Sequence, residues 1–179
     1  MEARRRSEVG GEKVTEHQRL FLVQADSNFR AYKLFRGQET LSLHSCHILY
    51  YLQMAMELLG KAHAWKQGPT RKTHRAFVNF LRSLSFNRKA QKKLGYAGKI
   101  EMWEHKLRKS VSLAQAIENL APANAGEGPN HEYPWPPDTP TGAPVEFEFP
   151  VWTELTEKAH GHDFLALVEH LFSAAETYL

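Results

Sequence analysis

The hydrophobic pattern of the chain is densest between Leu43 and Trp65, where apolar side chains occupy nearly every helical position. No proline interrupts this stretch, and no glycine occurs in it before Gly60. A helix that is apolar almost all round needs several neighbours to cover it. We therefore expect residues 43–66 to form the central helix of an all-α domain.

Three polar residues break this pattern at spacings of four: Gln53, Glu57 and Lys61. At about 100° per residue each step drifts by only about 40°, so the three side chains form one stripe along the helix. An unpaired buried charge costs several kcal/mol. The stripe must therefore meet solvent, a partner chain or a ligand, and it is the first candidate for a functional site.

Four other segments show helical periodicity, which predicts helices at residues 15–36, 71–85, 99–120 and 164–178. With the central helix they give an up-and-down bundle of four to five helices, and the basic segment 87–95 is interpreted as a connector. The apolar residues that suggest the inward face of the first helix are Leu20, Val23, Phe29, Ala31, Leu34 and Phe35.

Polar residues mark two expected helix starts. Thr40 or Ser42 is placed to cap the central helix, and Asp163 is placed to cap the last one.

An irregular excursion precedes the last helix, because residues 121–150 contain eight of the nine prolines. Within it Val145, Phe147 and Phe149 alternate with acidic residues, which is typical of one short strand or of an extended strap against the bundle. We expect a single helical domain at residues 15–179, after a disordered basic arm at residues 1–14.

Length and composition agree with one domain, since 179 residues with 42% hydrophobic content bury one substantial core. Cys46 is the only cysteine and has no partner for an internal disulfide. We find neither a signal peptide nor an apolar run long enough to span a bilayer. The sequence predicts a cytoplasmic protein without membrane attachment.

Charge is distributed unevenly along the chain, although the net charge is only +3. Residues 61–109 contain fourteen Lys and Arg against two acids, whereas residues 110–179 contain one lysine against eleven acids. The two halves either neutralise each other across the fold or between subunits, or leave a basic surface for phosphates or RNA.

Three segments, "QADSNFRAYKLFRG", "HILYYLQMAMELLGKAHAW" and "KTHRAFVNFLRSL", together resemble the HEPN domains of prokaryotes. The family has a small residue and an acid in its first helix, here Ala25 and Asp26. The other matching residues are Gln53, Glu57, Lys61, Ala62, Thr73 and His74, with Leu58 where the family often has lysine. The resemblance implies a helical bundle whose second helix turns its polar face into a cleft, often at a dimer interface.

One family motif is missing. Active HEPN ribonucleases carry arginine, four to six residues of any kind, and then histidine, usually on the last helix. No arginine of this chain has a histidine at that spacing, and residues 164–178 contain no arginine. Cleavage of RNA needs a proton donor and acceptor beside a stabilising cation. The resemblance therefore implies the scaffold without the ribonuclease chemistry.

Other chemical motifs are weak. His44, Cys46 and His47 lie close together, but no second cysteine completes a structural zinc site, so we expect ordinary histidines and no metal. Phosphate-binding glycine loops and the serine-hydrolase elbow do not occur. His74, at a predicted helix start rich in arginine and lysine, is a better candidate for a phosphate contact.

Two hypotheses remain. The first is a non-catalytic, homodimeric binding module that holds a nucleotide, an RNA or a nucleotidyltransferase-type partner in a polar cleft, without catalytic residues or a cofactor. The second is a divergent, toxin-like ribonuclease that uses His74 or His47 with nearby arginines. The missing motif favours the first. The residues assigned to the cleft are His47, Gln53, Glu57, Lys61, Arg71, His74 and Arg75.

Overall fold

The computed structural model describes residues 14–38, 43–65, 74–138 and 140–177. Within these ranges the chain forms helices and no strand, and its one isolated β-bridge joins Trp135 to Gly142. The predicted all-α class is confirmed. The basic arm expected at the start of the chain lies almost wholly outside the described residues.

Five longer helices correspond to the five predicted segments. They are α1 (Glu16–Gly37), α2 (Ser45–Ala64), α3 (Ala76–Leu84), α5 (Ile100–Glu118) and α8 (Ala159–Ser173). Three shorter ones complete the described part of the fold: α4 (Arg88–Lys93), α6 (Pro122–Ala125) and α7 (Pro150–Glu157).

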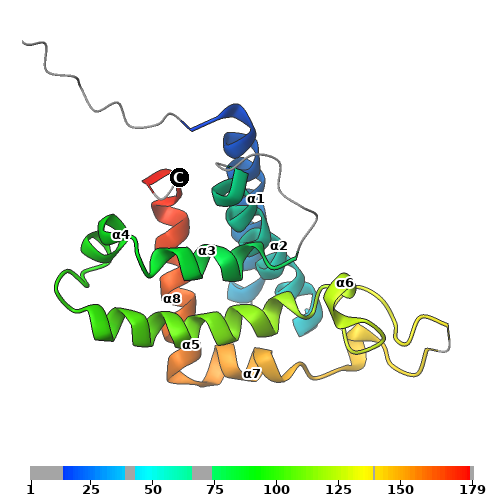
Figure 1. Cartoon of the computed structure of the whole chain (residues 1–179). Coiled ribbons are helices and arrows are strands. Elements are labelled where there is room, and N and C mark those ends of the chain that lie inside the picture. Colours follow the sequence, from blue (N-terminus) through cyan, green and yellow to red (C-terminus); the bar gives the residue numbers. More distant parts are fainter. Residues whose placement is uncertain (1–13, 39–42, 66–73, 139, 178–179) are drawn as a thin grey trace, which may run out of the picture.

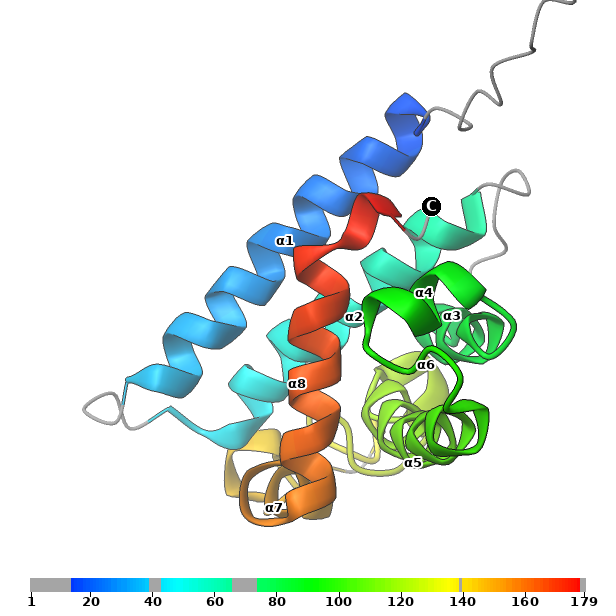
Figure 2. The same cartoon turned by 90° about the vertical axis from the view of Figure 1, so that its left-hand side faces the viewer.

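The bundle contains two groups of helices that cross each other. Figure 1 shows α1, α2 and α8 upright, with α3, α5 and α7 running across them. The quarter turn in Figure 2 shows α3 and α5 nearly end-on, which confirms the crossing. α4 lies at one end of α3 and α6 near the other (Figure 1).

Helix α2 lies at the centre of the fold, as its sequence predicts. It packs against α1, α3 and α5. Leu52, Ala55 and Met56 are completely buried, and Leu59 is nearly so. An apolar surface that extends around most of the helix is thus covered by neighbours on several sides.

Helix α1 begins where the sequence predicts, but its inward face differs from the prediction. Thr15 and Gln18 form a capping box at its start. The core side carries Ala25, Phe29 and Tyr32, whereas three of the apolar residues expected there are more than half exposed. These three are Leu20, Val23 and Leu34.

Two predicted N-caps are wrong, and the third predicted helix begins at Ala76 instead of residue 71. Helix α2 begins at Ser45 with His44 as its N-cap, and the expected caps Thr40 and Ser42 lie outside the described residues. Helix α8 begins at Ala159, so Asp163 lies inside the helix instead of capping it.

The basic connector contains a helix of its own. Asn87 accepts a hydrogen bond from the Ala90 amide and caps α4.

The Pro-rich excursion forms a strap and not a strand. Residues Pro144–Glu146 make a 3₁₀ turn, and the chain then runs extended through Phe147 into α7. Phe149 is buried in the core and packs edge-on against Phe147, but Val145 faces solvent. An extended segment without a pairing partner cannot build a sheet ladder, so the alternating pattern serves packing alone.

Candidate functional site

The polar stripe of α2 lies mostly inside the protein, which corrects the expected open cleft. Gln53 and Glu57 are buried, and the Lys61 side chain is 22% exposed. Because α1, α3 and α5 close around α2, the stripe meets other side chains of the same chain and has little contact with solvent. Its polar groups are satisfied largely within the fold.

Glu57 is the hub of this polar cluster. Its carboxylate accepts hydrogen bonds from Gln53 Nε2 at 2.8 Å and from Lys61 Nζ. His74 Nδ1 lies 2.8 Å from Oε2 of the same carboxylate, the oxygen that also accepts the hydrogen bond from Gln53. Burial by itself raises the pKa of Glu57, but the bonds from Lys61 and His74 outweigh it and lower that pKa below its usual range. Glu57 is therefore a buried carboxylate kept in its charged form.

Gly60 allows the segment that enters α3 to approach α2 closely. A Cβ at this position would clash with the carbonyl carbon of Ala76 and would lie 2.5 Å from the amide nitrogen of Phe77. Glycine removes this obstacle. The start of α3 can thus lie directly on α2, which places His74 beside Glu57.

A second buried carboxylate, Glu118 at the end of α5, holds the start of α3 from another side. Its Oε1 accepts the amides of Phe77 at 2.9 Å and Val78 at 3.4 Å. Burial raises the pKa of Glu118 to about 7, although these two amides oppose the shift. Within the described ranges, Oε2 of this carboxylate has no hydrogen-bond partner. Protonation of Glu118 is therefore favoured by the fold.

Asn124 in α6 links the two parts of the polar cluster. Its Nδ2 donates to the Glu118 carbonyl at 2.7 Å and to the His74 carbonyl at 3.4 Å. The backbone at His74 is thus held from both sides, by α2 through its side chain and by α6 through its carbonyl.

Only the edge of the polar cluster reaches the surface. The His74 side chain is 38% exposed, and the neighbouring Arg75, the N-cap residue of α3, is exposed. Arg71 lies outside the described residues. His47 is exposed near the start of α2, about 15 Å along the helix from Glu57, and does not join the others.

The histidines near Cys46 do not form a ligand set. Cys46 is buried, whereas His44 and His47 are exposed with ring centroids 6.4 Å apart. In the part of the chain that the structure describes, no three His, Cys, Asp or Glu side chains are grouped so that they could hold a metal ion.

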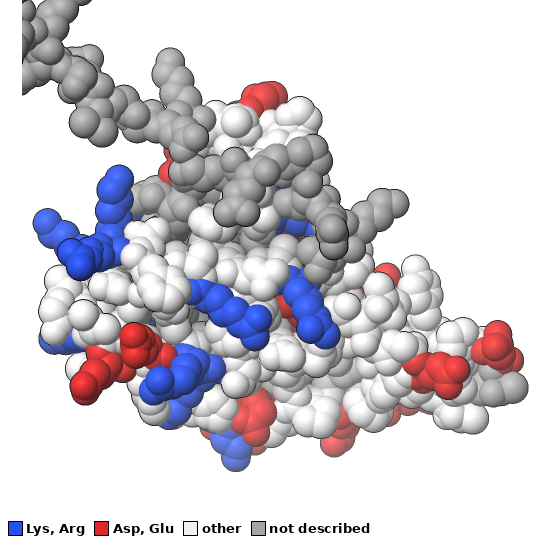
Figure 3. Space-filling model, viewed as in Figure 1, with Lys and Arg blue, Asp and Glu red and all other residues white. Residues whose placement is uncertain are grey.

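A basic face formed by α3, α4 and α5 is the second candidate site. Figure 3 shows Lys and Arg side chains gathered over these helices, with a smaller acidic group beside them. The end of the molecule formed by the Pro-rich segment shows acidic side chains in the same view. The exposed cations of these helices and of the turn before α5 are Arg82, Arg88, Lys89, Lys92, Lys93, Lys99, Arg108 and Lys109.

Most of these cations are not neutralised by the protein. Among the described residues, none of Arg82, Arg88, Lys89, Lys92, Lys99, Arg108 and Lys109 forms an ion pair within 4 Å. Among the described residues, acids of the last third of the chain pair with Lys33 (Glu169, 3.7 Å) and with Lys106 (Asp163, 3.9 Å). The uneven charge along the sequence therefore persists on the surface.

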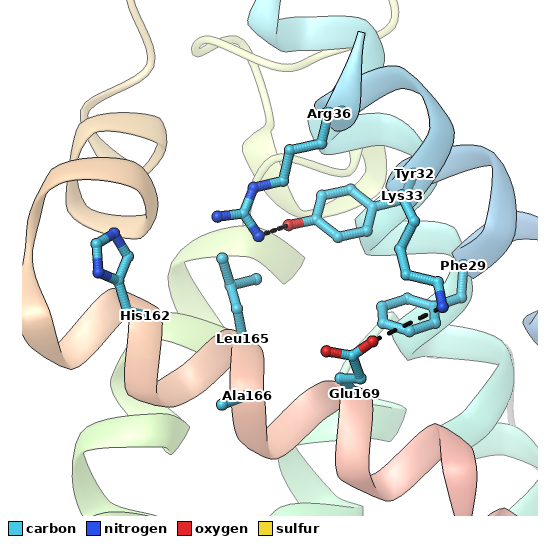
Figure 4. A pocket seen from close by; sticks show the side chains of 9 residues that line it. Phe29, Tyr32, Lys33, Arg36, His162, Leu165, Ala166 and Glu169 are labelled. Carbon is cyan, nitrogen blue, oxygen red and sulfur yellow. Dashed lines mark hydrogen bonds and ion pairs between the residues drawn. The ribbon is translucent and has the colours of Figure 1, made fainter.

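A pocket of about 490 Å³ between α1 and α8 has a different character. Figure 4 shows Arg36 donating to the hydroxyl of Tyr32, at 3.2 Å, and Lys33 paired with Glu169. Phe29 forms part of its wall. Because Lys33 is paired with Glu169, this pocket has fewer unpaired cations than the face formed by α3–α5.

Sequence reasoning missed Glu118, Asn124 and Gly60, which complete the polar cluster. Glu118 lies in a helix position otherwise occupied by core residues, next to Ile117 and four residues after Ala114, both fully buried. A carboxylate on that helical face was the available signal.

No model of a known family matches this chain, and neither a characterised protein nor a solved structure matches it. In the described residues, every helix is too short or too polar to cross a membrane. The resemblance to HEPN domains thus stays a hypothesis.

Proposed function

We propose that this protein is a non-catalytic helical module that binds RNA, or a nucleotide-like polyanion, through the basic face of α3–α5. The observation that carries the proposal is that seven exposed cations form no ion pair in the described part of the chain: Arg82, Arg88, Lys89, Lys92, Lys99, Arg108 and Lys109. Lysine and arginine side chains without an ion pair inside the protein can replace the counterions of a phosphate backbone.

The basic face replaces the cleft along α2 as the proposed binding surface. The buried carboxylate of Glu57 already has three partners, so it offers little to a ligand. The polar cluster instead fixes the start of α3 and hence the orientation of the basic face. A nucleotidyltransferase-type protein partner remains a proposal that only the HEPN resemblance supports.

Catalysis is not part of this proposal, because the chain lacks the arginine-to-histidine spacing of HEPN ribonucleases. A missing positioned acid or base costs about two to four decades in rate. The protein should therefore hold RNA without cutting it.

The proposal is tested by measuring RNA affinity at increasing salt, with Lys89→Glu/Lys92→Glu and a control, Arg30→Glu, on α1. Binding should weaken steeply with salt and further in the α4 variant, while the control retains most of its affinity. Arg30 is exposed and paired only with Asp26, so its reversal leaves the basic face intact. Equal losses in both variants, or no binding at low salt, would refute the proposal.

A second candidate function rests on one contact. A buried carboxylate that orients a half-exposed imidazole, as Glu57 does with His74, is the arrangement that prepares a histidine for proton transfer. The exposed Arg75 lies next in sequence. This geometry supports the divergent ribonuclease; metal-free cleavage of single-stranded RNA that is lost in His74→Ala would establish it in place of the non-catalytic module.

We also propose a homodimer, with the interface on α1 instead of α2. The polar stripe of α2 is mostly buried and therefore offers no surface to a second copy of the chain. The outer face of α1 offers such a surface. Leu20, Val23 and Leu34 fall within about 60° of one another on the helix, and each is more than half exposed. Such a stripe suits association between two copies of the chain.

A further inference from the structure

The most exposed of the large hydrophobic side chains among the described residues lies on the basic face. Phe86, in the turn between α3 and α4, is 89% exposed. A surface phenylalanine in so open a position gains almost nothing from burial within its own chain. It is thus available to an external partner.

The turn that carries Phe86 is held firmly by hydrogen bonds. Trp103 Nε1 donates to the Leu84 carbonyl at 3.2 Å, and Gln91 Nε2 donates to the Ser85 carbonyl at 3.0 Å. Both donors belong to residues that are buried or nearly so. The backbone is therefore fixed before any partner arrives, which lowers the entropic cost of binding.

Phe86 borders a pocket of about 530 Å³ between the end of α3 and the middle of α5. Leu107 and Val111 give the pocket an apolar floor, and Arg82 and Arg108 stand at its border. Hydrogen-bonding groups are also present, because Ser85, Glu104 and Ser112 complete the lining.

Neither arginine has an ion pair with a described residue, in contrast to Lys33 of the α1–α8 pocket, which pairs with Glu169. A pocket with an apolar floor, an exposed phenylalanine ring and two unpaired guanidinium groups is complementary to a ligand that combines a flat, uncharged ring with anionic groups. An unpaired nucleobase on a phosphate backbone has this combination, since bases stack on aromatic rings and arginine binds phosphate.

We infer that Phe86, Arg82 and Arg108 form a base-stacking subsite that makes the protein a binder of single-stranded nucleic acid. This inference rests on the proposed function and specifies its ligand. One unpaired base stacks on Phe86 above the floor formed by Leu107 and Val111, and the two arginines bind the flanking phosphates. A duplex, whose bases are already stacked, does not fill the pocket.

The test measures the affinity of the full-length protein for three probes by fluorescence anisotropy at one salt concentration. The probes are an oligoadenylate RNA, an abasic strand of the same length and charge, and a duplex. The RNA strand should bind about tenfold or more tightly than the abasic strand, and Phe86→Ala should remove most of that difference. Phe86→Trp should retain it. Ile100→Ala, at another exposed apolar side chain on α5, is the matched control and should change nothing.

The arginines give an independent readout. Arg82→Ala and Arg108→Ala should weaken the RNA and the abasic strand alike, and each should reduce the steepness of the salt dependence by about 0.7 for a single strand. Melting curves monitored by circular dichroism should be unchanged in all these variants because the side chains are exposed.

The outcomes separate the two proposals. Equal affinity for RNA and abasic strands, unaffected by Phe86→Ala, would overturn the stacking subsite and leave polyanion binding intact. A duplex bound more tightly than the single strand would overturn it too. Absence of binding to all three probes at low salt would overturn the proposed function itself.

Discussion

The carboxylate of Glu57 lies 2.8 Å from Nδ1 of His74, although the two residues are 17 positions apart in the sequence and belong to different elements. This contact joins the polar stripe of α2 to the chain entering α3. It converts a row of polar side chains, which looks like a ligand site in the sequence, into an internal support for α3.

Removal of the hub of this cluster should destabilise the fold. Glu57→Ala leaves Lys61, Gln53 and His74 without their common acceptor inside the protein, and breaking a buried charged pair costs about 3 to 5 kcal/mol. Thermal melting should show a decrease of roughly 10 °C in Tm. Glu16→Ala, which removes an exposed pair with Arg19, should leave the melting temperature almost unchanged. Similar melting temperatures for the two variants would contradict the role given to Glu57.

Gly60 should tolerate no side chain. In Gly60→Ala the added methyl group meets the backbone of Ala76 and Phe77, so α3 must move away from α2, at a cost of about 1 to 3 kcal/mol or more. Gly37→Ala is the matched control, because nothing lies within 4 Å of a Cβ there and alanine favours the helix by up to about 1 kcal/mol. Chemical denaturation should give opposite signs for the two changes; a stabilised Gly60→Ala protein would show that the two helices are not in close contact.

Glu118 should make the protein less stable as the pH rises. Its pKa is raised from 4.5 to about 7 in the fold, so the folded state favours the protonated acid. The stabilisation is complete below pH 4.5 and is lost between pH 4.5 and 7, by up to about 3 kcal/mol. Glu118→Gln should remove this decline, since the amide oxygen still accepts the Phe77 and Val78 amides. The free energy of unfolding of both proteins across this pH range tests the claim, and parallel curves would contradict it.

His131 should have the opposite effect and make the protein less stable as the pH falls. It is buried with no hydrogen-bond partner for either ring nitrogen among the described residues, and burial lowers its pKa to about 4. The folded state therefore favours the neutral ring, and stability is lost as the pH falls from 6.5 to 4, by up to about 3 kcal/mol. His131→Phe keeps the aromatic contact with Tyr50 and should diminish this acid sensitivity. Because the windows of His131 and Glu118 overlap and their effects oppose each other, the two largely cancel in the unmodified protein. Each single variant should therefore reveal the slope caused by the other group, as measured by urea denaturation.

The apolar stripe on α1 predicts the behaviour of the protein in solution. Val23→Glu places a charge in the middle of the stripe and should shift a dimer towards monomer in light scattering, with little change in the monomer's melting curve because the side chain is more than half exposed. A monomer at all concentrations in the unmodified protein would exclude the homodimer.

Periodicity predicted the helices well because burial follows helical spacing. In α3, for example, Phe77, Leu81 and Leu84 are all fully buried. The same rule misled in α1, where Leu20, Val23 and Leu34 are as regularly spaced as the buried Ala25, Phe29 and Tyr32. A pattern shows that a face is apolar but not whether a neighbour covers it.

The candidate site was predictable only in part, for a similar reason. The spacing of Gln53, Glu57 and Lys61 showed that one face of α2 is polar. Whether that face opens or closes depends on His74 and Glu118, which reach it from other elements. The spacing of residues within one helix cannot predict contacts with residues that are distant in the sequence.

The separation of charge between the α3–α5 face and the Pro-rich end has a consequence for how the protein moves before it touches anything. A molecule that is basic at one side and acidic at another has an electric dipole moment, and the field of a polyanion exerts a torque on it (Figure 3). The protein should therefore rotate its basic face forward while it is still approaching, so that more encounters are productive. Added salt screens this field within about 10 Å at 0.1 M, so encounter rates should fall as ionic strength increases.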